Sequence, residues 1–386
     1  MHILHITNSY GGTEVYKNLY TQLDNLAIQQ TIYVPLNAQN RKRVGNHMIA
    51  FKTHGSKIVY STVLQKRHRY FYMAKINRIV TDICQKIDLS SVDAIHASTL
   101  CADGGAAYKL HLKYNIPFIV AIRNTDVNDY YRVFIWRKWY FSKILNSASK
   151  IIFISPKYKE FFLDKVIPLA MATNIQNKIE VIPNGIEPYF LRNRKFNHKD
   201  IGDKIQLLFI SAFKKGKGLL ETILAVDILR AEGYNVTLRA IGKGLPNRSI
   251  DAEYMNKVEQ LTLDRPWIYL EEFKRPPELC KALLNADIFV MPSKPETFGL
   301  VYIEALSQNV PIVYTKGEGF DGFFPDGVVG YPAEAGDASN IKKQIENVIK
   351  NYKKLSSNIS KINLHEFFDW AMIAKRYENI YNKLRS

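Results

Sequence analysis

Short apolar runs alternate along the chain with longer stretches in which apolar residues recur every three or four positions. The apolar runs are four to seven residues long and end in polar or glycine-containing segments. They occupy residues 2–7, 31–35, 94–97, 117–122, 150–155, 179–183, 205–211, 235–241, 267–270, 288–291 and 310–314. Runs of this length between helical patterns predict buried strands connected by helices, which is the arrangement of a parallel α/β sheet.

The polar and charged residues 190–204 divide this pattern into two halves. A chain of 386 residues is long enough for two domains of ordinary size. We predict two Rossmann-like parallel-sheet domains, residues 1–189 and 190–364, that face each other across a central cleft. Residues 365–386 have the pattern of one amphipathic helix, whose apolar face is formed by Trp370, Ile373, Tyr377, Ile380 and Tyr381.

The most informative stretch is residues 286–314, where an apolar run, a loop with two prolines, a helical pattern and a second apolar run follow one another. This order predicts a βαβ unit with a loop at the carboxyl end of its first strand, where open α/β sheets bind ligands. Glu296 and Glu304 flank the predicted helix start, and eight residues of helix, the step from one to the other, would rise roughly 12 Å. We interpret Glu296 as a sugar ligand, Glu304 as a ribose ligand and the free N–H groups of the helix start as a diphosphate site.

Glycine and lysine follow several of the other predicted strands. Gly12 belongs to a glycine pair between the first strand and the first helix, where backbone can approach a phosphate closely. Lys217 lies in a glycine-flanked loop and can place a cation on a diphosphate, while Gly242 and Gly244 permit close backbone approach. Singly, such glycines are typical of tight turns and such a lysine of a solvated surface. The ordered set within one α/β domain favours a nucleotide diphospho-sugar site.

The first half of the chain offers two further candidates. Residues 123–126, Arg-Asn-Thr-Asp, follow the strand 117–122 at its carboxyl end, where the sequence fits a ligand contact and a helix cap before Val127 equally well. Residues 130–143 combine aromatic with basic side chains. That combination suits a membrane interface, base stacking with single-stranded nucleic acid, or a buried helix whose charged heads reach solvent.

Charge is distributed unevenly between the two halves. The formal net charge is +17, and residues 1–190 carry 24 Lys and Arg against 12 Asp and Glu. Such a balance indicates an anionic partner, namely membrane lipid, an acidic acceptor or nucleic acid, or it serves solubility alone.

Hydropathy and cysteine usage set the expected compartment. The chain has no run of about 18 apolar residues, so we expect no transmembrane helix. Its first residues have the pattern of a strand and not of a signal peptide. Cys84, Cys101 and Cys280 are odd in number and show no paired spacing, which predicts a reduced, cytoplasmic protein without a zinc site.

These residues together resemble a known family, the retaining glycosyltransferases of family 4, which have the GT-B fold. The strongest match is the family's Glu-x7-Glu motif with its Pro-Ser lead, at Pro292, Ser293, Glu296, Thr297, Phe298, Gly299, Leu300, Val301, Glu304 and Ala305. The likeness extends over nearly the whole chain, with supporting matches at Gly11-Gly12, residues 182–186, Lys217-Gly218, Ile241-Gly242 and the tail with Trp370, Tyr377 and Tyr381. In that family the tail crosses back onto the first domain, and the resemblance implies the same for residues 365–386.

The resemblance implies a role for each matching residue. Glu296 would contact the hydroxyls of the donor sugar and Glu304 the ribose, while Lys217 would neutralise the diphosphate. The implied donor-binding set is Gly12, Lys217, Gly242, Glu296, Phe298, Gly299, Leu300, Val301 and Glu304. The implied catalytic set is Glu296, Lys217, Arg123 and Asp126. Reaction on one face of the sugar, with the leaving phosphate taking the acceptor's proton, would need no metal, no cofactor and no separate protein base.

Two positions depart from the family pattern. The family usually has Gly-Arg after the first strand of the second domain, where this chain has Ser211 and Ala212. Either Lys214 or Lys215 substitutes for that arginine, or phosphate binding is weaker. Many members have a histidine where this chain has Arg123, a cation that can bind phosphate, an acidic sugar or an acidic acceptor. Asp126 would orient Arg123 or contact an acceptor hydroxyl.

The sequence therefore predicts a retaining hexosyltransferase. Its donor would be a nucleotide-diphosphate sugar and its acceptor a lipid-linked glycan or polysaccharide in cell-surface glycan synthesis, reached by a cytoplasmic enzyme held peripherally on the anionic inner membrane face. Two alternatives stay open, a nucleotide-sugar 2-epimerase on the same fold and a non-catalytic protein that binds membrane or nucleic acid. Nucleic acid is the less expected partner, because Glu296, Glu304 and Lys217 would have no use in such a protein.

Overall fold

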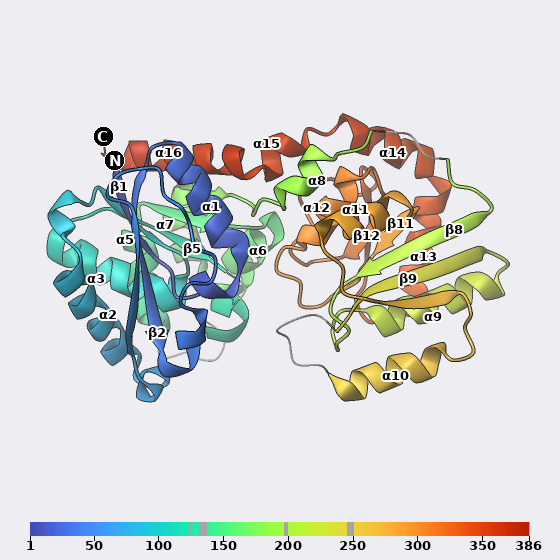
Figure 1. The fold of residues 1–386 in the computed structure, drawn as a ribbon, viewed down its shortest axis with the longest axis horizontal. Helices are drawn as coiled ribbons and strands as arrows, with labels where there is room; N and C mark the ends of the chain where they lie inside the picture. The colour runs from blue at the N-terminus through green and yellow to red at the C-terminus, as the bar shows by residue number, and fades with distance from the viewer. Residues whose placement is uncertain (124, 131–136, 197–199, 245–250, 386) are drawn as a thin grey trace. The chain divides into compact units, whose positions relative to one another are not determined.

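The computed structural model describes residues 1–123, 125–130, 137–196, 200–244 and 251–385. The chain forms two compact units. The first unit contains Met1–Ile154, Tyr158–Asn184 and Trp370–Ser386, and the second contains Ser155–Lys157 and Gly185–Asp369. Each unit is a parallel sheet covered by helices, as the alternating pattern predicts (Figure 1).

The first unit is built on a seven-stranded sheet. Its strands are β1 (His2–Ile6), β2 (Gln29–Asn37), β3 (Lys57–Leu64), β4 (Ala94–Ala97), β5 (Phe118–Ile122), β6 (Lys150–Phe153) and β7 (Ile179–Val181). They lie in the order β3-β2-β1-β4-β5-β6-β7, and all neighbours pair in parallel. The order reverses between β1 and β4, and the carboxyl ends of the strands lie at one edge of the sheet, where such folds bind ligands.

Helices cover both faces of this sheet. One face packs against α2 (Tyr72–Lys86), α3 (Gly105–Tyr114), α5 (Lys138–Ser147) and α7 (Leu169–Ile175), and the other against α1 (Glu14–Asn25) and α16 (Trp370–Arg385). A further helix, α6 (Pro156–Phe161), follows β6. Short helical turns are η1 (Tyr10–Gly12), η2 (Ala38–Arg43), η3 (Lys66–Arg69), η4 (Leu89–Ser91), η5 (Leu100–Gly104), η6 (Thr125–Tyr130), η8 (Phe162–Val166) and η9 (Gln176–Lys178). The predicted apolar face of α16 is buried, and α16 packs on α1 (Figure 1).

The second unit is built on a six-stranded parallel sheet. Its strands are β8 (Lys204–Ile210), β9 (Asn235–Lys243), β10 (Ile268–Glu272), β11 (Ile288–Val290), β12 (Ile312–Thr315) and β13 (Gly330–Ala333), in the order β10-β9-β8-β11-β12-β13. Its helices are α8 (Pro188–Arg192), α9 (Leu219–Ala231), α10 (Ala252–Thr262), α11 (Pro276–Leu284), α12 (Leu300–Ser307), α13 (Ala338–Lys350), α14 (Tyr352–Lys361) and α15 (Leu364–Phe368). Because β8 and β11 are neighbours, the loops that follow them lie side by side.

Two strands fall outside the predicted set, and both lie at sheet edges. Most residues of β3 are partly or fully exposed, so the strand lacks the continuous apolar run of a central parallel strand. β13 contains Pro332, which an edge strand tolerates and a central strand excludes. The physical signal that identifies buried strands is weak at both positions.

One predicted helical rise and one predicted helix boundary are wrong. α12 begins at Leu300 with Gly299 as its N-cap, so Glu296 precedes the helix, and the roughly 12 Å rise expected between Glu296 and Glu304 does not apply. The single C-terminal helix is two helices, because Asp369 has an extended conformation between α15 and α16. α15 belongs to the second unit and α16 to the first.

Two features are absent from the part of the chain that the structure describes. None of the helices in that part combines the length and the hydrophobicity that crossing a bilayer requires. The described residues also contain no group of three His, Cys, Asp or Glu side chains arranged to hold a metal ion. Cys84, Cys101 and Cys280 are free thiols.

Gly242 has a structural reason to be glycine that its motif did not indicate. It lies near the end of β9 with φ at 136°, and a Cβ there would lie 1.9 Å from the carbonyl oxygen of Ser211, just beyond β8. The close backbone approach at Gly242 is therefore one between neighbouring strands of the protein itself. Its contact with a donor stays a prediction.

Replacing Gly242 with Ala is expected to lower the free energy of unfolding of the second unit by about 3 kcal/mol or more, because both the backbone angle and the clash oppose a side chain. The matched control is Gly233→Ala, at φ 93° with no atom within 4 Å of the new Cβ, which should cost about 1 kcal/mol from the backbone angle alone. Urea unfolding of both variants measures the difference. Equal losses would contradict a clash with Ser211.

Candidate functional site

The loop between β11 and α12 carries Glu296 at the carboxyl edge of the second sheet. β11 is fully buried and ends at Val290, after which Pro292 and Pro295 interrupt the strand. The chain enters α12 through Gly299, whose φ of 76° is left-handed. A Cβ at Gly299 would lie 2.3 Å from the ring of Tyr302, so this helix start requires glycine.

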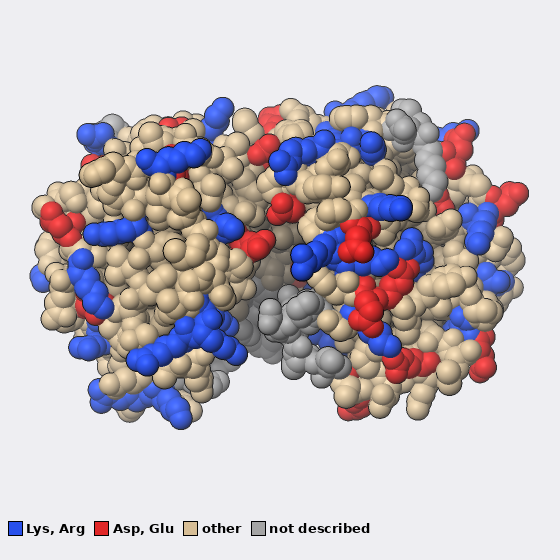
Figure 2. Space-filling model, viewed as in Figure 1, with Lys and Arg blue, Asp and Glu red and all other residues tan. Residues whose placement is uncertain are grey.

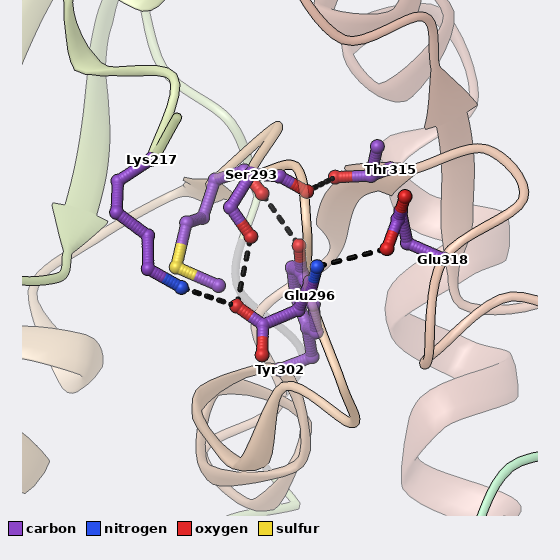
Figure 3. A network of polar contacts seen from close by, with 7 residues as sticks. Lys217, Ser293, Glu296, Tyr302, Thr315 and Glu318 are labelled. Carbon is purple, nitrogen blue, oxygen red and sulfur yellow. Dashed lines mark hydrogen bonds and ion pairs between the residues drawn. The ribbon is translucent and has the colours of Figure 1, made fainter. Parts of the chain in front are cut away.

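Glu296 is held through both its side chain and its main chain (Figure 3). Its Oε2 accepts hydrogen bonds from Lys217 Nζ and Ser293 Oγ, each at 2.8 Å. Its N–H donates to the Glu318 carboxylate at 2.8 Å, and its carbonyl accepts from the N–H of Gly319 at 2.8 Å. Within the described part of the chain, Oε1 of Glu296 accepts no hydrogen bond, so one carboxylate oxygen is anchored and the other is available to a ligand.

A second layer of hydrogen bonds fixes the residues around Glu296. Thr315, at the end of β12, donates its hydroxyl to the carbonyl of Ser293 at 2.9 Å, and the Tyr302 hydroxyl donates to the carbonyl of Met291 (Figure 3). Buried hydrogen bonds of this kind restrict the loop to one conformation. The carboxylate of Glu296 is therefore preorganised before any ligand arrives.

Lys217 reaches Glu296 from the loop after β8. The two loops are also joined by a main-chain bond, in which the N–H of Lys294 donates to the carbonyl of Gly216 at 2.7 Å. The side chains of Lys217 and Glu296 are only 16% and 14% exposed, so solvent screens their ion pair weakly. Ala212, which stands where the family usually has arginine, is buried and supplies no cation.

Glu304 lies in the second turn of α12, outside the hydrogen-bond network of Figure 3. Its side chain is partly exposed, and burial together with the nearby Glu187 carboxylate raises its pKa from 4.5 to about 7. A carboxylate that titrates near neutral pH gains most from hydroxyl donors, because they stabilise its charged form. The structure thus makes Glu304 electrostatically distinct from Glu296.

The other predicted residues of this loop can contact a ligand mainly through main-chain groups and less through their side chains. The Phe298 side chain is buried, with its ring centroid 5.5 Å from Phe323 and 6.2 Å from Phe368. Leu300 and Val301 form the first turn of α12, where the helix provides no acceptors for the N–H groups. An anion placed there would receive hydrogen bonds from backbone amides.

Gly12 lies in the first unit at the end of η1 and is exposed. A Cβ at Gly12 would lie 3.4 Å from Nη1 of Arg43, and a Cβ at the buried Gly11 would meet the backbone of Arg43. Arg43 therefore places a guanidinium beside the glycine pair. Arg43 belongs to the basic run Arg41-Lys42-Arg43, whose local sequence pattern does not indicate this contact.

Arg123 follows β5 in the first unit. Its Nε donates to the carbonyl of Ser98 and its Nη1 to Oδ1 of Asn184, each at 3.3 Å. The guanidinium also lies 5.8 Å from the ring centroid of Tyr16. The side chain is thus positioned but partly exposed, and its charge remains accessible to an anion.

Asp126 is buried, and its carboxylate accepts hydrogen bonds from nearby backbone N–H groups. Its carboxylate accepts hydrogen bonds from the N–H groups of Leu100 at 3.1 Å, Cys101 at 2.7 Å and Arg123 at 2.9 Å. It therefore caps η5, not the turn before Val127, and its bond to Arg123 fixes that residue's backbone. Burial raises the pKa of Asp126, opposed by these backbone hydrogen bonds. Its contact with an acceptor stays a prediction.

The aromatic and basic stretch 130–143 is only partly covered, because residues 131–136 lie outside the described residues. Within α5, Tyr140 and Phe141 are buried, as expected of a core helix, whereas Trp139 is exposed. The guanidinium of Arg137 lies 5.0 Å from the ring centroid of Tyr72. The stretch thus combines a buried face, to which Arg137 belongs, with an exposed face that carries Trp139 and Lys143.

Of the predicted residues, the structure brings Lys217, Glu296 and the start of α12 together in the second unit. Gly12, Arg123 and Asp126 belong to the first unit. The sequence did not indicate Glu318, which accepts the N–H of Glu296, because this bond joins loops 22 residues apart. Arg43 was missed for the same reason.

Two family models match the chain. Glycosyltransferase Family 4 matches residues 10–190, and Glycosyl transferases group 1 matches residues 192–363. Among curated relatives, the capsular polysaccharide biosynthesis glycosyltransferase CapM of Staphylococcus aureus is 29% identical over 61% of this chain and 62% of its own length. The N-acetyl-alpha-D-glucosaminyl L-malate synthase of Bacillus anthracis is 27% identical over 53% of each chain. The aligned part thus spans between half and two thirds of these two relatives.

Solved structures match over the whole fold. Anabaena Alr3699/HepE in complex with UDP has a TM-score of 0.72 and 15% identity, covering 99% of this chain and all of that one. The lipopolysaccharide outer core galactosyltransferase WaaB in its apo form has a TM-score of 0.71 and 16% identity, with the same coverage. These likenesses confirm the predicted fold class, two Rossmann-like parallel-sheet domains of the GT-B type. Since the two models together match nearly all of the chain, it belongs to the family 4 glycosyltransferases.

Proposed function

We propose that the protein transfers a sugar, with retention of configuration, from a nucleotide-diphosphate sugar to a lipid-linked or polysaccharide acceptor in cell-surface glycan synthesis at the cytoplasmic face of the membrane. The observation that carries this proposal is the anchored Glu296 carboxylate beside Lys217 and the start of α12. A sugar nucleotide presents hydroxyls and a diphosphate, and these groups match a carboxylate, a cation and free backbone amides. The capsular polysaccharide relative supports the choice of pathway class.

Each residue has a distinct task in this proposal. Oε1 of Glu296 accepts hydroxyl hydrogen bonds from the donor sugar, while Oε2 remains anchored. Lys217 and the N–H groups of Leu300 and Val301 bind the diphosphate, and they stabilise the charge that develops as it leaves. Glu304 accepts the ribose hydroxyls. With Ala212 in place of arginine, Lys214 or Lys215 supplies any further positive charge.

Two residues of the first unit have proposed roles of their own. Gly12, with Arg43 beside it, approaches the diphosphate, and Arg123 binds an anionic part of the donor or the acceptor. Asp126 acts as a positioning residue that holds the backbone of Arg123. In this scheme the leaving phosphate accepts the acceptor's proton, so the reaction needs neither a metal nor a protein base.

The direct test is a thermal-shift screen of UDP-, GDP-, ADP- and TDP-sugars, because a ligand of the folded state at about 100 times its Kd adds about 2.7 kcal/mol to stability. Donors that bind are then assayed for transfer or hydrolysis, and NMR of the product determines its anomeric configuration. If no donor is turned over or hydrolysed, and nucleotide binding is unchanged in Glu304→Ala, the proposal is wrong. An inverted product would overturn the retaining mechanism alone.

Replacing Glu296 with Gln is expected to lower kcat by about a hundredfold, while affinity for a nucleoside diphosphate without sugar changes by about threefold or less. Gln keeps the shape but removes the charge that holds Lys217 and receives the sugar hydroxyls. The control is Glu334→Gln, which removes an ion pair of the same 2.8 Å length on an exposed surface. Turnover of the Glu296 variant at the control's level would contradict the assignment.

Nucleotide affinity is expected to rise with pH between about 6 and 8, because the Glu304 carboxylate is the better ribose acceptor and its pKa is about 7. Calorimetric titration with UDP or GDP across this range measures the effect. Glu304→Gln should bind more weakly and lose the pH dependence. A pH dependence that survives in the variant would assign it to another group.

The free energy of unfolding also depends on the protonation of Glu304, but it changes with pH in the opposite direction to nucleotide affinity. The folded-state pKa of Glu304 lies above its ordinary value of 4.5, so the folded protein holds an extra proton between about pH 4.5 and 7. The contribution of Glu304 to the free energy of unfolding therefore falls as the pH rises through this window. The Gln variant should lose that slope in urea unfolding, which separates an electrostatic change from general damage.

Replacing Asp126 with Asn is expected to lower the free energy of unfolding of the first unit by about 2–3 kcal/mol, because an amide cannot accept the three backbone bonds. Turnover of the protein that remains folded should stay near the wild-type value. Asp164→Asn, at an exposed carboxylate of the same unit, is the control for stability. Normal stability with lost turnover would instead give Asp126 a role in acceptor binding.

A further inference from the structure

A polar pocket lies at the carboxyl edge of the first sheet, apart from the residues assigned above. Its volume is about 820 Å³, within the range of small-molecule sites, roughly 300–1,000 Å³. The ends of β2 and β3 and the turns η2 and η3 that follow them provide much of its wall. The polar lining includes Asn37, Asn40, Gln65, Lys66, His68 and Lys75.

The pocket is cationic and carries no compensating acid among its described lining residues. The sequence explains this, because residues 25–81 contain ten Lys and Arg and no Asp or Glu. On the face shown in Figure 2, Lys and Arg gather over the lower part of the first unit, where Figure 1 places β2. An unbalanced positive charge around a concave site favours an anionic ligand.

The polar side chains of the pocket are arranged as donors. Oδ1 of Asn37 accepts the N–H of Asn40 at 2.9 Å, so its amino group remains available to a ligand. Nδ1 of His68 accepts the N–H of Gln65 at 2.9 Å, which places the proton of the neutral ring on Nε2. Burial lowers the pKa of His68 and keeps that ring neutral. Such donors suit phosphate oxygens and sugar hydroxyls.

Lys75 adds a further basic side chain to the lining of the pocket. Burial lowers its pKa, and the Asp103 carboxylate opposes this shift. Asp103 is itself fixed, because it accepts the N–H of Asn8 at 3.1 Å and the hydroxyl of Thr99 at 2.8 Å. Lys75 thus places its amino group in a partly buried position in the pocket wall, with the Asp103 carboxylate nearby.

An apolar groove of about 340 Å³ adjoins this pocket, and Tyr70 lines both. The groove is walled by Phe71, Met73, Trp139 and Tyr140, of which Phe71 is 64% and Trp139 58% exposed. Nη2 of Arg137 donates to the carbonyl of Tyr70 at 3.1 Å, which fixes the boundary between the two cavities. Clustered exposed aromatic side chains of this kind mark a binding surface for apolar matter.

We propose that the pocket and the groove together bind a phosphate-bearing amphiphile, with its anionic head in the pocket and its hydrocarbon chain along the groove. The inference rests on the proposed function, in which it names the class of the acceptor. A small anion would leave the aromatic groove exposed, and an apolar chain alone would leave the cations of the pocket unpaired. One molecule that carries both groups complements both cavities.

The test is calorimetric titration of the full-length protein, without nucleotide, with dodecyl phosphate below its micelle concentration. Inorganic phosphate and dodecyl maltoside are the two comparison probes. We expect dodecyl phosphate to bind about tenfold or more tightly than either, with affinity that falls as salt rises. Equal affinity for dodecyl maltoside or for inorganic phosphate would overturn the proposal, because one of the two cavities would then contribute nothing.

Variants of exposed residues assign the two halves of the site. Lys66→Glu and Phe71→Asp should each weaken dodecyl phosphate binding by about five- to tenfold. The matched controls are Lys165→Glu and Leu169→Asp, which make the same changes at exposed positions of the same unit outside both cavities. All four positions are on the surface, so thermal unfolding should be near that of the wild type. Controls that weaken binding as much as the test variants would refute the assignment.

The donor screen separates this inference from the proposed function. Nucleotide-sugar binding without dodecyl phosphate binding would overturn the acceptor class and leave the transferase proposal standing. Dodecyl phosphate binding by a protein that neither binds nor hydrolyses any donor would overturn the proposed function. A soluble phosphorylated glycan that binds as tightly as dodecyl phosphate would also count against a lipid acceptor, because the apolar groove would then contribute nothing to the affinity.

Discussion

The Lys217–Glu296 ion pair joins the loops of two neighbouring strands, and the geometry of the candidate donor site depends on it. Both side chains are mostly buried, so removal of either would leave a poorly solvated charge, at a cost of about 3 kcal/mol. The main-chain bond from Lys294 to Gly216 and the bonds of Glu296 to Glu318 and Gly319 fix the same loops independently. The protein thus forms the site before a ligand binds, and a donor loses little free energy in ordering it.

Anchoring also determines how charge is balanced when a donor arrives. In the free protein Glu296 neutralises Lys217, so a diphosphate must either share the ammonium group or draw it away from Oε2. Ser293 keeps a hydrogen bond to Oε2 in both cases, and the carboxylate need not turn. Glu304 meets the opposite situation, because burial and then the nearby Glu187 carboxylate raise its pKa. Glu296 is thus held by an ion pair with a cation, whereas Glu304 lies near a second carboxylate.

The strands that form the centre of each sheet could be predicted from the sequence because parallel strands buried on both faces are continuous apolar runs. The edge strands β3 and β13 could not, since one is half-exposed and the other contains proline. Glu296 and Lys217 were accessible to sequence reasoning because each follows a buried strand. Glu318, Arg43 and the cap that Asp126 provides to η5 depend on contacts between loops distant in sequence, which no local pattern records.

The two units use charge in different ways, and this difference bears on what each one binds. In the second unit basic side chains form ion pairs with acidic ones, as in Lys217–Glu296, Arg239–Glu271 and Arg265–Asp227. These ion pairs fix the positions of the side chains. In the first unit residues 25–81 carry positive charge without any acid in that stretch, and such charge acts at longer range on an approaching anion. Paired charges favour a ligand recognised by exact placement of its groups, as a nucleotide sugar is. Unpaired charge beside an exposed aromatic groove favours a partner drawn from an anionic surface.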